Sequence, residues 1–142
     1  MIHNFLFPTY HNLWLSLLLL AGRIVFGGMF LTHGLQKLAN FKAMSANFPS
    51  IMGMGNTLSL SLAIFAEVFC TLGFITEFLY RLSMIPMIFT MIVAAFFIHG
   101  NDPFSAKEMA LLYLSIFIMM YILGPGSFAA DYFFANSTFC RP

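Results

Sequence analysis

Two ionisable residues stand deep inside long apolar segments, where an isolated charge is costly. Arg23 lies within the segment at about 13–35 and Glu67 within the segment at about 57–79. A single charge at the centre of a bilayer costs roughly 2.5 to 3.5 kcal/mol on insertion scales. Counted from a common membrane face at 1.5 Å per residue, Arg23 falls at roughly 15 Å and Glu67 at roughly 18 Å. The matched depths predict that the two side chains pair inside a helix bundle.

Such a pair is compatible with two roles. In a catalytic role, Glu67 would relay protons beside Arg23, or the pair would hold a polar head group, because ionisable residues inside a membrane commonly mark functional sites. In a structural role, the pair would only fix the register of the two helices, as buried polar groups can do. The sequence leaves both roles open.

A second polar group is predicted at one membrane boundary. His33 and Lys37 stand four residues apart, on the same face of the first helix, and His99 ends the third apolar segment at the same level. Together they predict a substrate-binding pocket suited to a quinone carbonyl or a lipid head group. Two histidines could also ligate haem, but a position near the interface favours hydrated polar side-chain tips instead.

The cysteines predict no metal site. Cys70 and Cys140 lie far apart, with no CxxC pair and no Cys/His ligand spacing around them. We therefore expect no metal and no covalently bound cofactor. Because a CxxC pair is missing, any redox chemistry would need electrons from a partner subunit.

The composition places these residues in a membrane protein. Of 142 residues, 61% are hydrophobic and only 8% are charged, whereas about a quarter are charged in a typical soluble domain. A net charge of +1 also offers no basic surface for nucleic acid. Since each span uses about 20 apolar residues, the length accommodates four. We predict an all-α fold, an integral membrane four-helix bundle, formed by a single domain over residues 1–142.

Turn-forming residues set the boundaries of the four spans. They predict helices over about 13–35, 57–79, 82–99 and 106–123, followed by a short interfacial tail at 127–134. Asn56 or Thr57 is the expected N-cap of the second span, and Ser105 with Glu108 forms an S-x-x-E capping box for the fourth. Tyr80 and Arg81 are expected in an interfacial turn. The few lysines and arginines leave the orientation in the membrane open.

Four segments of the chain resemble the DoxX family of small bacterial membrane proteins. They are AGRIVFGGMFLTHGLQKL in the first span, AEVFCTLGFIT in the second, AAFFIHG at the end of the third and GPGSFAAD after the fourth. The resemblance covers most of residues 17–132. The chain departs from the family pattern where members close the second span with Thr-Arg, because here Thr76 is followed by Glu77.

The resemblance implies a multi-pass protein of the bacterial inner (cytoplasmic) membrane. The family is named after a subunit of an archaeal thiosulfate:quinone oxidoreductase, and some members are linked to complexes that handle thiols or reactive oxygen. It therefore implies a membrane subunit of a quinone-linked oxidoreductase, in contact with a partner subunit and the lipid bilayer. The alternative is a non-catalytic scaffold or assembly factor with a structural ion pair. Glycines in the first span would permit a homodimer.

Overall fold

Four helices that are long and apolar enough to span a membrane make up the computed structural model, which describes residues 13–126. They are Leu13–Ala39, Asn56–Thr76, Tyr80–Ile98 and Phe104–Leu123. Each lies within a few residues of a predicted span, and the described residues contain no strand. The all-α membrane bundle is therefore confirmed, while the predicted tail at 127–134 lies outside the described residues.

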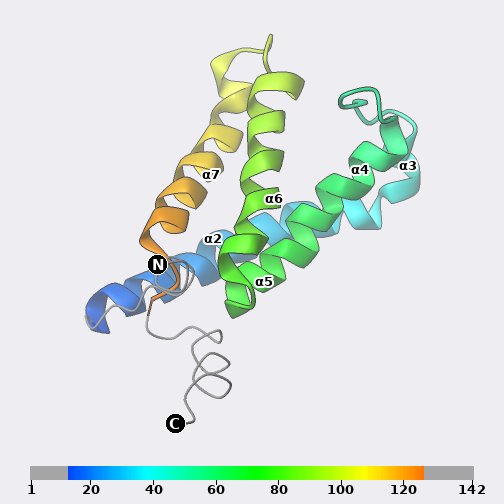
Figure 1. Ribbon diagram of the computed structural model, residues 1–142. Coiled ribbons are helices and arrows are strands. Elements are labelled where there is room, and N and C mark those ends of the chain that lie inside the picture. The colour runs from blue at the N-terminus through cyan, green and yellow to red at the C-terminus, as the bar shows by residue number, and fades with distance from the viewer. Residues whose placement is uncertain (1–12, 127–142) are drawn as a thin grey trace.

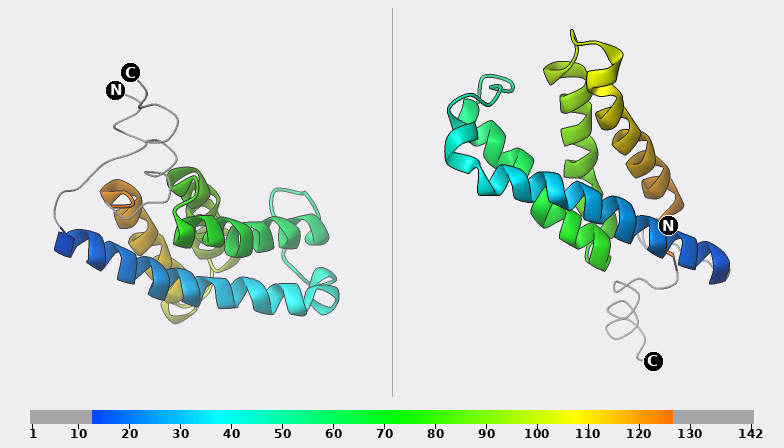
Figure 2. Two further views of the ribbon diagram at one scale, coloured as in Figure 1. Left: turned by 90° about the horizontal axis from the view of Figure 1, so that it is seen from below. Right: turned by 180° about the vertical axis from the view of Figure 1, so that it is seen from behind.

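The helices form two antiparallel hairpins (Figure 1). The first contains α2 (Leu13–Ala39) and the segments of the second span, α4 (Asn56–Ile64), η1 (Phe65–Cys70) and α5 (Thr71–Thr76). The second contains α6 (Tyr80–Ile92), η2 (Val93–Ile98) and α7 (Phe104–Leu123). The short α3 (Phe41–Ser45) follows α2. The second hairpin crosses the first at an angle, and α2 extends past the end of α5 beneath α7 (Figure 2).

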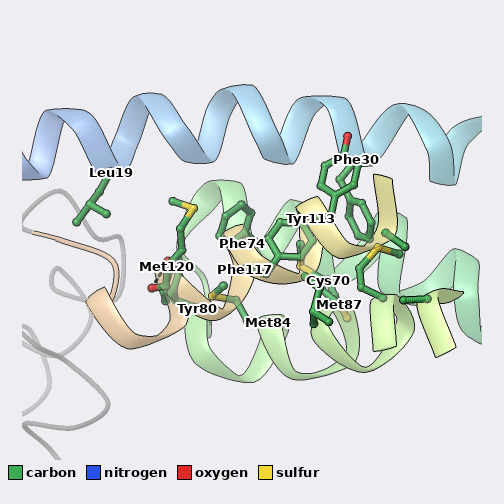
Figure 3. Close-up of a cluster of buried hydrophobic side chains, with 14 residues drawn as sticks. Leu19, Phe30, Cys70, Phe74, Tyr80, Met84, Met87, Tyr113, Phe117 and Met120 are labelled. Atoms are coloured by element: carbon green, nitrogen blue, oxygen red, sulfur yellow. Dashed lines mark hydrogen bonds between the residues drawn. The ribbon is translucent and has the colours of Figure 1, made fainter. Parts of the chain in front are cut away.

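Aromatic and methionine side chains fill the space between the hairpins (Figure 3). Phe30 of α2 contacts two rings of α7, with its centroid 5.2 Å from that of Tyr113 and 5.0 Å from that of Phe117. Phe74 of α5 stacks on Tyr80 of α6 at 5.6 Å. Each ring therefore joins two helices. Many large apolar side chains on the outer surface are exposed, as expected where lipid tails surround a bundle.

Two segments of the spans widen into π-helix, η1 in the second span and η2 in the third. A π-helical turn accommodates an additional residue and is often found at functional sites. Glu67 lies in η1, and His99 directly follows η2. Two of the residues singled out from the sequence thus stand at irregular turns, which the hydropathy pattern did not predict.

Three predicted boundary details are wrong. The second span has Gly55 as its N-cap, and the fourth begins at Phe104 after Pro103, without a side-chain cap from Ser105. The helix therefore begins two residues earlier than predicted, with Pro103 as its N-cap residue. The turn between the second and third spans falls at 77–79, so Tyr80 and Arg81 are buried within α6 instead of forming an interfacial turn.

Candidate functional site

A cavity of about 200 Å³ lies between α2, η1, η2 and α7. Its wall contains all three residues predicted to bind substrate, together with Glu67. The lining residues are Phe30, His33, Lys37, Glu67, Met91, Ala94, His99, Ala106, Met109, Ala110 and Tyr113. The structure thus gathers His33, Lys37 and His99 from two spans, and it adds Glu67 from a third.

The carboxylate of Glu67 forms an ion pair with the ammonium of Lys37. Glu67 is buried, whereas about a quarter of the Lys37 side chain is exposed, so this pair reaches from the bundle interior to its surface. The contact depends on a close approach of α2 to η1. A Cβ on Gly34 would lie 2.8 Å from both the backbone carbon and the Cβ of Glu67. Glycine at this position therefore allows Lys37, one turn further along α2, to reach Glu67.

The two histidines enter the cavity wall in different ways. His99 Nδ1 lies 2.8 Å from an oxygen of the Asp102 carboxylate, which orients the ring at the end of η2. His33 meets Tyr113 edge to face, with ring centroids 6.0 Å apart. His33 itself is exposed, so the cavity wall near it reaches the surface of the bundle.

Tyr113 is a cavity residue that the sequence analysis missed. It lies in the middle of α7 among apolar residues, and nothing in its sequence surroundings distinguishes it from the other aromatic residues. Its hydroxyl is buried and has no hydrogen-bond partner among residues 13–126, and the same holds for Oε2 of Glu67. Most buried polar atoms in proteins are hydrogen-bonded, so two unpaired atoms in one cavity wall require an explanation.

Arg23 lies in a second cluster, at the opposite end of the bundle. Its fully buried guanidinium pairs with the carboxylate of Glu77 and donates a hydrogen bond of 2.9 Å to the backbone oxygen of Pro125. Glu77 occupies the left-handed region, with φ of 63°, at the C-terminal end of α5. Arg23 thereby connects α2, the end of the second span and the chain that follows α7.

The predicted pairing of Arg23 with Glu67 is wrong, because the depth estimate assumed that the two helices begin and end at common planes. In the structure Gly34 lies against Glu67, and Gly27 lies against Phe74. Continuing in that register places Arg23 beside Glu77, about ten residues from Glu67. The first part of α2 extends past α5, as Figure 2 shows, so equal depth along each helix does not mean equal height in the bundle.

The third span completes the cluster around Arg23. The hydroxyl of Tyr80 donates a hydrogen bond of 3.1 Å to the backbone oxygen of Met120 in α7. The guanidinium of Arg81 lies 5.2 Å from the ring centroid of Tyr121, within the range of a cation–π contact. All four spans are therefore connected by polar contacts at this end, and these contacts stabilise the bundle.

The comparisons with curated proteins and with solved structures each find no match. The sequence model described as DoxX matches residues 18–100, which is more than half of the chain and includes Arg23, the cavity residues of the first three spans and Glu77. This chain, a membrane protein with four spanning helices, belongs to the DoxX family.

Proposed function

We propose that this DoxX protein is the quinone-binding membrane subunit of an oxidoreductase complex in a bacterial inner membrane. The observation that carries the proposal is the cavity at one end of the bundle. It combines a buried carboxylate, an ammonium group, two imidazoles and a phenol with apolar walls. Small-molecule sites typically have mostly apolar linings with a few polar groups that fix orientation.

The volume of the cavity supports a single aromatic ring as ligand. An apolar cavity of roughly 150 Å³ is large enough to bind benzene. At about 200 Å³ this cavity would accommodate the substituted ring of a quinone but not its isoprenoid tail. A tail would remain in the surrounding lipid, alongside the apolar outer surface of the helices. A ring-sized cavity with a few polar groups in an apolar wall thus fits an amphipathic ligand of this class.

The chemistry of the cavity residues supports the same ligand. Reduction of a quinone to a hydroquinone consumes two electrons and two protons. Glu67 and Lys37 lie where protons could pass between the cavity and the surface, because their ion pair spans that distance. The chain contains no CxxC pair, so the electrons come from a partner subunit that oxidises a thiol or a reduced sulfur compound. Arg23 pairs with Glu77 at the other end of the bundle, and we assign it a structural role there.

The proposal is tested with the purified chain in lipid nanodiscs. Quinone or hydroquinone extracted with the protein, or bound when the short-chain compounds are added, is expected in the wild type. His99→Ala is expected to reduce this binding strongly, and Glu67→Gln to reduce strongly the binding of the hydroquinone. Glu108→Gln is the matched control, since it makes the same change at an exposed carboxylate of α7 outside the cavity wall. A wild-type preparation that contains no quinone and binds none at saturating concentration would refute the proposal.

The cluster around Arg23 favours a second candidate, a scaffold without catalytic activity. Its polar contacts tie all four spans together, which is what a protein that positions a partner would require. In that case the stability of the bundle would be sufficient for function. A stable variant with Arg23→Met and Glu77→Leu would remain active in cells, and so would Glu67→Gln. Loss of activity in Glu67→Gln at normal abundance would contradict the scaffold role.

A further inference from the structure

Two unpaired polar atoms define the hydrogen-bonding character of the cavity. Oε2 of Glu67 and the hydroxyl of Tyr113 are both buried, both side chains line the cavity, and neither atom has a partner among residues 13–126. The other carboxylate oxygen, Oε1, is already engaged by Lys37. A carboxylate oxygen can only accept a hydrogen bond, whereas a phenol both donates and accepts one. A ligand that pairs with Oε2 of Glu67 must therefore supply a donor, whereas the hydroxyl of Tyr113 can pair with either a donor or an acceptor.

The two redox forms of a quinone differ in whether they can donate a hydrogen bond. The carbonyl oxygens of the oxidised form accept hydrogen bonds only, so they could pair with Tyr113 but would leave Oε2 of Glu67 unpaired and facing another partial negative charge. A hydroquinone carries two hydroxyls, each of which donates and accepts. It can donate to Glu67 while it accepts from Tyr113. An unpaired buried acceptor is costly, and a hydrogen bond to a charged group is among the stronger ones.

We propose that this cavity selects the reduced form, and that Glu67 and Tyr113 are its specificity-determining residues. Glu67 recognises the hydroxyl hydrogen that only the hydroquinone carries, and Tyr113 contacts the ring oxygen of either form. The inference rests on the proposed quinone site and adds to it the preferred redox state of the ligand. A hydrogen bond to a charged partner corresponds to an affinity ratio of about 10 to 100 in favour of the hydroquinone.

The experiment compares the affinities of a short-chain benzoquinone and its hydroquinone for the full chain in nanodiscs. Titrations are followed by isothermal calorimetry, with the hydroquinone series kept anaerobic. The wild type is expected to bind the hydroquinone at least about tenfold more tightly. Glu67→Gln should abolish this preference, because the amide can donate to a carbonyl as well as accept. Tyr113→Phe should weaken the binding of both forms but retain the preference for the hydroquinone, because the carboxylate of Glu67 is unchanged.

The outcomes separate this inference from the proposed function. If both forms bind with equal affinity, or if the quinone binds more tightly, the selectivity is refuted while the quinone site stands. If neither form binds, the proposed function fails and the selectivity fails with it. If both substitutions weaken both forms equally, Glu67 does not distinguish them and the assignment is wrong. Tyr113→Phe keeps the ring that packs against Phe30 and Phe117, so its effect reports the hydroxyl and not the core.

Discussion

Replacement of Gly34 by alanine tests the helix register that positions the candidate site. The added Cβ would lie 2.8 Å from the backbone carbon of Glu67, from its Cβ and from a methyl group of Val68. These contacts are too short, and the backbone of η1 cannot move away as a flexible side chain would. Overpacking of this kind typically costs about 1 to 3 kcal/mol.

Gly28→Ala is the matched control for this substitution. Gly28 lies in the same helix, and a Cβ built there meets nothing within 4 Å. Alanine gains about 0.5 to 1 kcal/mol over glycine inside a helix, and this gain applies at both positions. It therefore cancels when the two variants are compared. We expect Gly34→Ala to be less stable than Gly28→Ala by about 1 to 3 kcal/mol, the overpacking cost alone.

The measurement is the free energy of unfolding in mixed micelles titrated with SDS. Near-ultraviolet circular dichroism follows the loss of aromatic packing, because the helices themselves persist in detergent. If the Gly34→Ala protein is as stable as the Gly28→Ala protein, α2 and η1 do not approach each other as closely as they do in the structure. That result would contradict the contact between Lys37 and Glu67. It would also contradict the cavity geometry that depends on this contact.

Other substitutions test the cluster at the opposite end. Arg23→Met should cost about 3 to 5 kcal/mol, because it leaves the buried carboxylate of Glu77 unpaired. Adding Glu77→Leu should recover most of this stability, whereas adding Glu67→Leu should not. Recovery with Glu67→Leu instead would contradict the observed ion pair between Arg23 and Glu77. Tyr80→Phe should cost about 1 kcal/mol through the lost hydrogen bond to α7, and an unchanged stability would show that this bond contributes nothing. Gly124→Ala should cost about 1 to 3 kcal/mol in unfolding titrations, because its φ of 82° with ψ of −178° is almost restricted to glycine. An unchanged stability would contradict that backbone conformation.

The polar end of the bundle could be located from the sequence for a simple reason. His33 and Lys37 share a helical face by their spacing, and His99 ends the third span, so the antiparallel order of the spans alone brings them to one end. In the structure these three residues line one cavity. Tyr113 could not be identified in the same way, because an aromatic residue inside an apolar helix usually belongs to the core, and only the neighbouring helices determine which ring borders a cavity.

The amino-acid sequence by itself determined that the chain spans a membrane four times, because hydropathy and turn residues act locally along the chain. It also determined that buried charges must find partners, since lipid offers none. Only the tertiary structure decided which partners they find. The close contacts of Gly27 and Gly34 set the register between the first two spans, and α2 extends past α5, so Arg23 meets Glu77 while Glu67 meets Lys37. Register and overhang depend on contacts between distant segments, and for that reason depth counted along each helix could not reveal them.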